Sequence, residues 1–362
     1  MTEREAMELC LELARKGWGR VSPSPLVGAV LLKDGVMVGE GHYAEFGGSH
    51  SEVVALEIAG ANALGSTCVV NLEPCSHYGK TPPCTDALIS AGVARVVIAN
   101  LDPNPEAGGG RQVLADAGID VEAGAMAEEA AALNAHFLWY HTRPSRPFVA
   151  VKLATSIDGY IADSAGDSKW ISGSEARNWV QQLRAGFDAI AVGRKTASAD
   201  NPALTVRGKI TPRHQPRRLI FTRSGQIDAN LKVLNTPSRG PAGVVKVGQT
   251  GLSEGDRGPD GHVQWSHAES LVGAFEDLRK QGVASVLCEG GASFAGELFR
   301  ADLVDRMYWI QSPKWLGDGV RAFCGLSAGT LSEAKSWVVT ERRTLGEDTL
   351  LVLDKELCLP AS

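Results

Sequence analysis

Apolar residues recur at two different spacings along the first 140 residues of the chain. Between residues 5 and 16, and again between 50 and 59, they fall at the interval of an amphipathic helix. Short apolar runs bounded by turn residues are typical of buried strands instead. The pattern predicts strands at 27–32, 36–39, 66–72, 95–99 and 119–121. It also predicts a helix at 84–89, one that ends at 115–118, and one at 126–140. Because helices alternate with strands, we expect a layered α/β domain.

A proline-containing linker follows this domain. Residues 142–147, Thr-Arg-Pro-Ser-Arg-Pro, carry two prolines and no apolar side chain, so they interrupt the pattern. Beyond them, apolar runs predict strands at 148–154, 189–193, 218–222, 285–289, 305–310 and 349–353, with a helix at 175–184. We expect these strands to form a mostly parallel sheet. The sequence therefore predicts two domains, residues 1–143 and 147–362.

Composition and charge narrow the class of protein. A chain of 362 residues exceeds one ordinary domain, and its 44% hydrophobic and 22% charged residues are typical of a globular protein. The charged start and the lack of a long apolar run predict neither a signal peptide nor a membrane span, so we expect a cytoplasmic protein. Its seven scattered cysteines fit a reducing compartment. The net charge of −6 disfavours a broad nucleic-acid surface and favours a small-molecule substrate.

Three residues have the types and order of a catalytic zinc site. His50, Cys75 and Cys84 supply one imidazole and two thiolates, which suit tetrahedral zinc with a fourth position open for water. Glu52 follows the histidine by two residues and is free to carry protons between that water and a substrate nitrogen. This order of histidine, glutamate and cysteines is typical of zinc-dependent nucleobase deaminases. We therefore expect one catalytic zinc ion per chain.

Both metal-binding segments are predicted to begin helices, where the helix dipole favours the thiolate form of cysteine. The alternatives for the three ligands, a structural zinc site or ordinary core positions, fit this context less well. For His77 a pocket position and an ordinary surface or core position are both open, and we favour the pocket. The loop at residues 102–105, Asp-Pro-Asn-Pro, either borders that pocket or is a simple surface turn.

The second half of the chain carries weaker chemical signals. A strand that ends at Glu289 and passes through Gly291 into a helix can bring backbone N–H groups against a phosphate, although a tight turn without a ligand has the same pattern. The polar loop from Asp200 to Arg207 carries one carboxylate and one guanidinium, suited to a sugar hydroxyl and a phosphate. The candidates for local positive charge are Lys152, Arg184 and Arg207.

Together these motifs resemble the bifunctional deaminase–reductase family of riboflavin biosynthesis, the RibD family. The resemblance rests on residues 50–52, 72–77, 79–84 and 102–105 in the first half, and on 152–154, 156–159, 170–173, 199–202, 204–207 and 289–291 in the second. It implies a cytidine-deaminase-like α/β/α domain followed by a dihydrofolate-reductase-like α/β domain. It also implies removal of the 2-amino group from 2,5-diamino-6-ribosylamino-4(3H)-pyrimidinone 5′-phosphate, followed by NADPH-dependent reduction of the ribosyl group to ribityl. A homo-oligomer without nucleic-acid or membrane partners is the expected assembly.

The resemblance implies residue roles as well. His50, Cys75 and Cys84 would hold zinc, and Glu52 would transfer protons. The expected NADPH contacts are Ala154, Trp170, Thr196, Asp200 and the turn at Gly291. The expected substrate contacts in the reductase domain are Ser168, Arg184, Leu204, Arg207 and Glu289. Arginines suit an anionic ribose phosphate, while hydride transfer needs mainly positioning and exclusion of water.

The chain departs from the family pattern at four places. Ser24 stands where asparagine is usual, so a short hydroxyl replaces an amide that would read the pyrimidine edge. The other departures are Val54 in place of a common histidine, Asn201 in place of a frequent aspartate, and the basic pair Arg194-Lys195. They leave the zinc chemistry intact but bear on substrate recognition.

Two alternatives therefore stand beside a fully bifunctional enzyme. In one, the reductase is retained while the deaminase is weakened or altered in specificity, as the substitutions at Ser24 and Val54 suggest. In the other, the chain is a nucleic-acid-editing deaminase with an appended binding module, which the acidic net charge disfavours.

Overall fold

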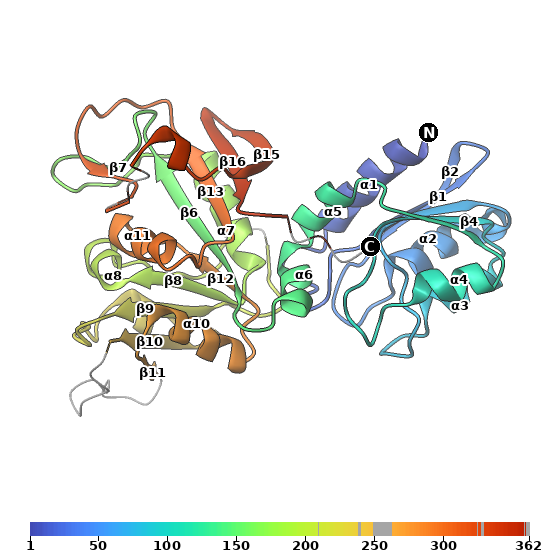
Figure 1. Ribbon diagram of the computed structural model, residues 1–362, viewed down its shortest axis with the longest axis horizontal. Coiled ribbons are helices and arrows are strands. Elements are labelled where there is room, and N and C mark those ends of the chain that lie inside the picture. Colours follow the sequence, from blue (N-terminus) through green and yellow to red (C-terminus); the bar gives the residue numbers. More distant parts are fainter. Residues whose placement is uncertain are drawn as a thin grey trace. The chain divides into compact units, whose positions relative to one another are not determined.

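The structure of the protein is a computed structural model (Figure 1). It describes residues 1–208, 210–237, 240–248, 263–323, 325–326, 329–357 and 359. The chain forms two compact units, Met1–Arg143 together with Leu357 and Leu359, and Pro144–Glu356. Within the described residues, no helix is both long and apolar enough to cross a membrane.

A five-stranded sheet with the order β2-β1-β3-β4-β5 forms the centre of the first unit. Strand β1 pairs antiparallel with β2 and β3, whereas β3, β4 and β5 run parallel. The strands are β1 (Gly28–Lys33), β2 (Val36–His42), β3 (Thr67–Leu72), β4 (Arg95–Asn100) and β5 (Asp120–Ala123). The strands predicted at these positions are confirmed, including β5 at the edge of the sheet.

Helices cover both faces of this sheet. Side chains of α2, α3 and α4 pack on one face and those of α1 and α5 on the other. The helices are α1 (Glu3–Arg15), α2 (Ser51–Ala59), α3 (Cys84–Ser90), α4 (Gly110–Asp116), α5 (Ala127–Leu133) and α6 (Ala135–Thr142), with a 3-10 turn at Gly60–Ala63. This arrangement is the α/β/α layering that the resemblance implied.

Two glycines on β2 let helix α2 lie directly on the sheet. A Cβ atom on Gly41 would come within 2.2 Å of the carbonyl oxygen of Ser51, and one on Gly39 within 2.2 Å of the carbonyl oxygen of Ala55. A larger residue at either position would push the helix away from the strand. Because Ser51 begins α2, Gly41 fixes how closely the start of this helix approaches β2.

The single helix predicted at residues 126–140 is wrong, because the chain forms two short helices, α5 and α6, that meet at Asn134. The buried side chain of Asn134 accepts a hydrogen bond from the N–H of Leu26 at 2.8 Å and donates one to its carbonyl oxygen at 2.9 Å. A buried amide needs such partners, so tertiary contacts outweigh the helical pattern here. The same two bonds hold the segment that follows Ser24 and Pro25.

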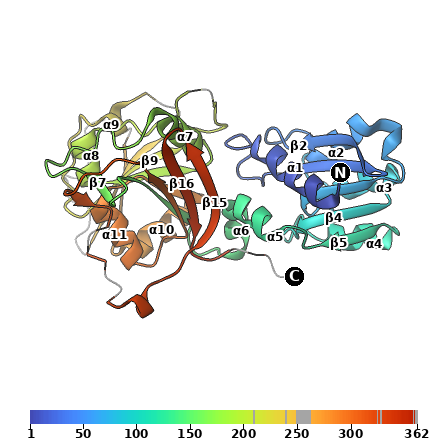
Figure 2. The ribbon, with the colours of Figure 1, turned by 90° about the horizontal axis from the view of Figure 1, so that it is seen from above.

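Nine strands form the main sheet of the second unit, in the order β11-β10-β9-β8-β12-β6-β13-β16-β15. Neighbouring strands are parallel from β11 to β13, and the antiparallel hairpin β15–β16 completes one edge (Figure 2). The strands are β6 (Phe148–Thr155), β8 (Ala189–Gly193), β9 (Arg217–Thr222), β10 (Ala242–Val247), β11 (Val263–Ala268), β12 (Ser285–Cys288), β13 (Arg306–Gln311), β15 (Val338–Leu345) and β16 (Asp348–Asp354). The mostly parallel sheet is confirmed, although the sequence pattern missed β10, β11 and β15.

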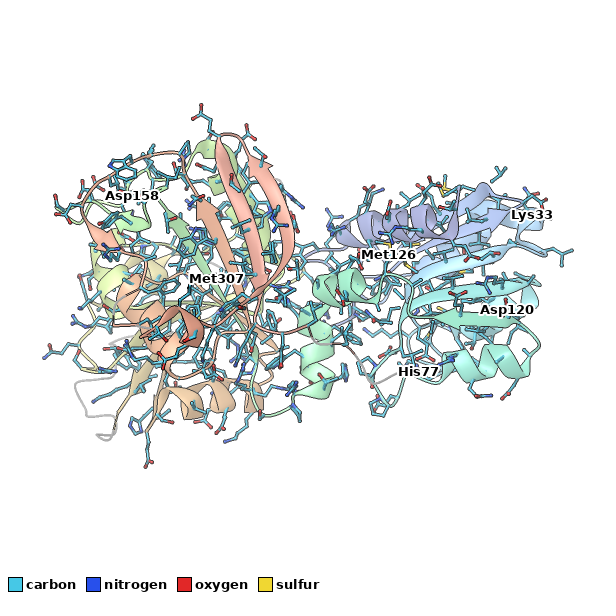
Figure 3. The ribbon with its side chains drawn as sticks, turned by 45° about the horizontal axis from the view of Figure 1, so that its top comes forward. Lys33, His77, Asp120, Met126, Asp158 and Met307 are labelled. Atoms are coloured by element: carbon cyan, nitrogen blue, oxygen red, sulfur yellow. The ribbon has the colours of Figure 1, made fainter. Side chains whose placement is uncertain are left out.

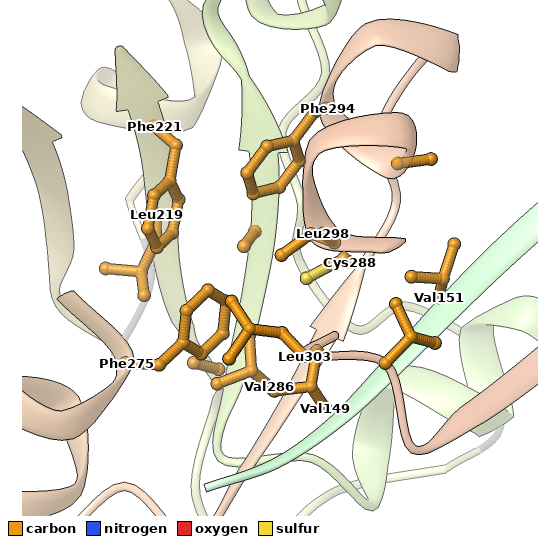
Figure 4. Packing of buried hydrophobic residues seen from close by; sticks show 14 of the residues in the cluster. Val149, Val151, Leu219, Phe221, Phe275, Val286, Cys288, Phe294, Leu298 and Leu303 are labelled. Atoms are coloured by element: carbon orange, nitrogen blue, oxygen red, sulfur yellow. The ribbon is translucent and has the colours of Figure 1, made fainter. Parts of the chain in front are cut away.

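A short second sheet and several helices complete this unit. Strand β7 (Tyr160–Ala162) pairs with β14 (Val320–Arg321). The helices are α7 (Ser174–Ala185), α8 (Arg194–Asp200), α9 (Lys232–Asn235), α10 (Leu271–Lys280) and α11 (Ala292–Arg300), with a 3-10 turn at Leu331–Glu333. A large apolar core lies where α10 and α11 pack on the sheet, and Figure 4 shows the rings of Phe221, Phe275 and Phe294 together in it. Cys288 is buried there as well, as expected of a small apolar residue.

Candidate active site

Three ligand atoms converge at one end of the first unit. His50 immediately precedes α2, Cys84 is the first residue of α3, and Cys75 lies in the loop after β3. The Nδ1 atom of His50 is 3.1 Å from the Sγ of Cys84 and 3.5 Å from the Sγ of Cys75. Ligands about 2.1 and 2.3 Å from a tetrahedral ion lie roughly 3.6 Å apart, so this donor set fits zinc with little adjustment. Among the described residues it is also the one group of its kind that could hold a metal ion.

The other nitrogen of the His50 ring has a partner of its own. Its Nε2 atom lies 3.4 Å from the hydroxyl of Thr81, a residue of the loop that joins Cys75 to Cys84. With Nδ1 as the metal ligand, Nε2 carries the ring proton and donates a hydrogen bond to the Thr81 hydroxyl. Such a bond orients the imidazole and fixes its tautomer.

The thiols of Cys75 and Cys84 differ in pKa. Hydrogen bonds from Cys84, together with His50, lower the pKa of the Cys75 thiol to about 4. The hydrogen bond to Cys75 and burial raise the pKa of Cys84. A cation between them favours both thiolates, because its charge outweighs the repulsion between the two sulfurs.

Glu52 lies beside these ligands in the first turn of α2 and is only 3% exposed. Burial raises the pKa of its carboxyl group, while the charge of His50 and a hydrogen bond from Ser51 act in the opposite direction. The Ser51 hydroxyl donates that bond at 2.8 Å. A carboxyl group whose pKa is raised toward neutrality can both take up and release a proton, as general acid–base catalysis requires.

A cavity of about 470 Å³ opens onto His50, Cys75 and Glu52. Its wall includes His77, in the loop between β3 and α3 (Figure 3), so the pocket position favoured for this histidine is confirmed. Asp102 and Asn104 line it too, which settles the open reading of the 102–105 loop in favour of a pocket border. The sequence did not single out several other lining residues, namely Tyr43, Phe46, Lys80, Tyr140 and His141. Lys80 belongs to the 79–84 segment, whereas no motif marks the other four, because the fold brings them in from separate parts of the chain.

A buried carboxylate holds the wall of this cavity in place. Glu73 accepts hydrogen bonds from the backbone N–H of Asp102 at 2.9 Å and of Arg111 at 2.7 Å. It thereby ties the 102–105 loop to the start of α4. Burial, reinforced by the charges of Glu73 and Cys75, raises the pKa of Asp102 to about 6. Besides Glu52, the cavity therefore contains a carboxyl group with a pKa of about 6.

Two departures from the family pattern lie in different surroundings. Ser24 lines the cavity, as the expected role in pyrimidine recognition requires. Val54 is not among the lining residues, because its Cβ lies against Gly41 where α2 packs on β2. The expectation that Val54 shapes the pocket is therefore wrong.

In the second unit, a buried ion pair joins two of the expected substrate residues. Arg184 of α7 donates from Nε to Glu289 Oε1 at 2.6 Å and from Nη2 to Oε2 at 2.9 Å. A third bond, from Nη1 to the carbonyl oxygen of Thr205, ties the pair to the loop before Arg207. Burial raises the pKa of Glu289, but the charges of Arg184 and Lys152 outweigh it, so the net shift is downward. Glu289 is accordingly an anion in the folded chain.

Two of the expected cofactor residues meet at helix starts. The hydroxyl of Thr196, in the first turn of α8, accepts a hydrogen bond of 2.9 Å from the N–H of Gly291, which immediately precedes α11. A Cβ on Gly290 would come within 2.8 Å of the Phe294 ring, so the turn has no room for a larger residue. Because residues 290 and 291 carry no side chain, a ligand can approach the backbone of this turn closely, as a phosphate site requires.

The other expected cofactor and substrate residues belong to separate segments of the second unit. Trp170 is 63% exposed, with the Arg177 guanidinium 4.5 Å from its ring centre. The charges of Lys169 and Asp167 act on Asp200, so the loop that contains Ser168 lies near the end of α8. Ala154 is near the carboxyl end of β6, and Arg207 is exposed.

Leu204 lies deeper than the other expected substrate residues. Its side chain is 2% exposed and packs in a core cluster with Ile190 and Ala197. The expected substrate contact of Leu204 stays a prediction. Asn201 has a local reason for its identity, because it ends α8 with a left-handed backbone (φ 41°), which asparagine tolerates better than most residues.

Comparison with known proteins first establishes the class. Residues 1–100 match the cytidine and deoxycytidylate deaminase zinc-binding region, and residues 147–351 match the RibD C-terminal domain. Together with the three converging ligands, these matches define a zinc-dependent deaminase joined to a reductase.

Relatives along the full length narrow the class. The riboflavin biosynthesis protein RibD of Haemophilus influenzae is 38% identical over 360 residues, 95% of each chain, and that of Escherichia coli is 38% identical over 98% of this chain and 99% of its own. A solved diaminohydroxyphosphoribosylaminopyrimidine deaminase/5-amino-6-(5-phosphoribosylamino)uracil reductase from Thermotoga maritima matches with a TM-score of 0.82 at 36% identity, over 97% of this chain and 98% of that one. The chain belongs to the RibD family.

Membership of this family confirms the fold and the general activity that the resemblance implied. The chain is a bifunctional deaminase and reductase of riboflavin biosynthesis that uses zinc and NADPH and acts on a small molecule. The alternative of a nucleic-acid-editing deaminase does not fit, because residues 147–351 match a reductase domain of this family.

Proposed function

We propose that the first unit removes the 2-amino group of 2,5-diamino-6-ribosylamino-4(3H)-pyrimidinone 5′-phosphate, and that the second unit reduces the ribosyl group of the product to ribityl. The observation that carries this proposal is the convergence of His50, Cys75 and Cys84 beside the buried Glu52, in a cavity large enough for a nucleotide-sized substrate. The name of the Thermotoga maritima relative supports the choice of substrate.

Each residue of the first site has a separate task. Zinc supplies a nucleophile near neutral pH by lowering the pKa of a water molecule. His50, Cys75 and Cys84 hold that ion at the end of the cavity. Glu52 takes up the proton of the attacking water and passes it to the substrate nitrogen, so that the amino group leaves as ammonia. Its burial keeps bulk water from competing for the proton.

The cavity wall supplies groups that can bind the substrate. Ser24, Asp102 and Asn104 offer polar atoms for the pyrimidine and the ribose. Lys80 offers positive charge for the phosphate, and its Nζ atom lies 3.8 Å from the centre of the Phe46 ring. The aromatic ring therefore helps to hold the only lysine of the described cavity wall.

In the second unit, the cofactor and substrate sites lie at the carboxyl ends of the parallel strands. NADPH supplies the hydride, and Ala154, Trp170, Thr196, Asp200 and Gly291 are its proposed contacts. The proposed substrate contacts are Ser168, Arg184, Arg207, Glu289 and the backbone of Leu204. The buried Arg184–Glu289 pair presents a fixed hydrogen-bonding edge, while the exposed Arg207 suits the phosphate.

The wider setting belongs to the same proposal. We assign the deaminase to residues 1–143 and the reductase to 147–362. The enzyme acts in the cytoplasm, where its described cysteines, all of them free, stay reduced. It works as a homo-oligomer without nucleic-acid or membrane partners.

The deciding experiment measures ammonia release from the diaminopyrimidine ribosyl phosphate by the zinc-loaded chain without NADPH. We expect release by the wild type and a loss of about 10²- to 10⁴-fold in a Glu52→Gln variant, because a general acid–base group is removed. The deaminated product is then supplied with NADPH, and Glu52→Gln should reduce it at the wild-type rate. A folded, zinc-loaded wild type that releases no ammonia would refute the proposed substrate.

A further inference from the structure

Ser51 makes a contact that the zinc-site pattern does not explain. It is the first residue of α2, between the ligand His50 and Glu52, and its side chain is completely buried. Its hydroxyl donates a hydrogen bond of 2.8 Å to Oε2 of Glu52. We propose that Ser51 is a positioning residue of the deaminase, whose hydroxyl holds one oxygen of Glu52 and leaves Oε1 for proton transfer.

This contact is not a default consequence of helix geometry. Successive residues of a helix point about 100° apart around its axis, so their side chains do not face each other. A serine hydroxyl at a helix start more commonly bonds a free backbone N–H group. No side chain caps α2, and among the described residues the Ser51 hydroxyl bonds to Glu52 alone. The carboxylate of Glu52 is therefore turned back toward Ser51.

Glu52 needs such a partner in order to keep one orientation. The terminal torsion of a glutamate side chain has a broad energy profile, so the carboxylate plane is not fixed by the side chain itself. At 3% exposure, bulk water does not hold it either. A charge-assisted hydrogen bond is about twice as strong as a neutral one, and the Ser51 hydroxyl donates such a bond whenever Glu52 is ionised and acts as a base. The Ser51 hydroxyl can therefore keep the carboxylate in the orientation that proton transfer requires.

The donor is fixed as firmly as the acceptor. The carbonyl oxygen of Ser51 lies against Gly41, where a Cβ would come within 2.2 Å of it. The carbonyl oxygen of the preceding His50 accepts a hydrogen bond from the N–H of Val54 at 3.1 Å. The backbone of Ser51 thus cannot shift without moving the start of α2 away from β2, so the fold fixes the position from which the hydroxyl reaches Glu52.

The test uses the zinc-loaded full chain and rests on the proposed role of Glu52. In Ser51→Ala we expect kcat for ammonia release to fall about tenfold, the effect of losing one hydrogen bond to a charged group. KM should stay within about twofold, and zinc content should remain that of the wild type. In Ser51→Thr the hydroxyl returns and kcat should recover. This split between kcat and KM distinguishes positioning from a general loss of structure.

A matched control removes a hydroxyl elsewhere in the same unit. Ser66 is also buried, and its hydroxyl donates to the carbonyl oxygen of Ala63 at 2.7 Å, so Ser66→Ala should leave kcat unchanged. A wild-type kcat in Ser51→Ala overturns the proposal, as does a loss of zinc that accounts for the lower kcat. A folded Ser51→Thr that stays as slow as Ser51→Ala also speaks against it. Retention of ammonia release by Glu52→Gln would instead refute the role of Glu52, so the two failures are distinguishable.

Discussion

The two active sites of this chain are built in different ways. The deaminase site takes its ligands and its proton-transfer residue from 35 consecutive residues, His50 to Cys84, and their side chains do the chemistry. The expected reductase residues extend from Ala154 to Gly291 and come from strand ends, loops and the helices α7 and α8. There the most specific geometry is a backbone turn at Gly291 and a buried ion pair, Arg184 with Glu289.

This difference decides how a substitution acts at each site. At the deaminase site, loss of one ligand atom removes chemistry while the surrounding core stays intact. At the reductase site, the same residues that contact ligands also hold the fold together, because Arg184 and Glu289 are buried and bonded to each other. A substitution there should change stability and activity together. The predictions below test this contrast.

The largest expected effect is the loss of a zinc ligand. In Cys84→Ala we expect ammonia release to fall by more than about 10³-fold, since zinc generates the nucleophile. Reduction of the deaminated product should stay at the wild-type rate. Cys68→Ala is the matched control, because Cys68 is a fully buried cysteine of the same unit that packs in the core on β3. Equal losses of ammonia release in Cys68→Ala and Cys84→Ala would show that the activity does not depend specifically on the ligand atom.

The buried ion pair of the reductase comes next. Arg184→Met leaves Glu289 without its partner, and breaking a buried pair costs roughly 3–5 kcal/mol of unfolding free energy. The double variant Arg184→Met/Glu289→Leu should regain most of that stability but not the reductase activity. Arg306→Met is the control, because it breaks another buried bidentate pair, with Asp354. It should lower stability without changing the KM for the deaminated substrate.

The stability that Glu289 contributes should depend on pH in one direction. The pKa of Glu289 is lowered in the folded chain from a reference value of 4.5. Its ionisation therefore stabilises the fold fully above that value, and the contribution is lost as the pH falls below it. Chemical unfolding at pH 7 and at pH 4 should show a smaller difference in Glu289→Gln than in the wild type. A larger difference in the variant would mean that the pKa of Glu289 is raised by folding.

A smaller effect is expected at the backbone turn. Thr196→Val keeps the volume of the side chain but removes the hydroxyl that accepts from the N–H of Gly291. The turn is then no longer held in one position. One such hydrogen bond corresponds to about 1 kcal/mol, so the KM for NADPH should rise roughly five- to tenfold. Thr340→Val, which removes a hydroxyl bonded to Val352 on the edge hairpin, should leave that KM unchanged. An unchanged KM in Thr196→Val would place the cofactor away from this turn.

How far sequence predicts each site follows from the same contrast. The zinc ligands, Glu52 and the pocket position of His77 could be predicted, because metal chemistry restricts residue types and the loops that carry them are short. The sequence left Asp102 open between a pocket border and a surface turn. Tyr43, Phe46 and Tyr140 could not, since nothing in their spacing marks a cavity wall. The break at Asn134 was missed for a related reason, because its partner, Leu26, is 108 residues away in sequence. Leu204 is a different case, because the family role assigned to it stays a prediction while its side chain is buried.

The smallest effect separates the fully bifunctional enzyme from one with an altered deaminase. Ser24 lines the cavity, and the segment that carries it is anchored by the two hydrogen bonds between Asn134 and Leu26. In Ser24→Asn a longer amide can reach the pyrimidine edge, and one added hydrogen bond should lower the KM for the diaminopyrimidine roughly three- to tenfold with kcat unchanged. Val54→His is the matched variant, because that side chain lies between α2 and β2 and should not lower KM. A higher KM in Ser24→Asn would mean that the present cavity is adapted to a different pyrimidine, which favours the altered-specificity alternative.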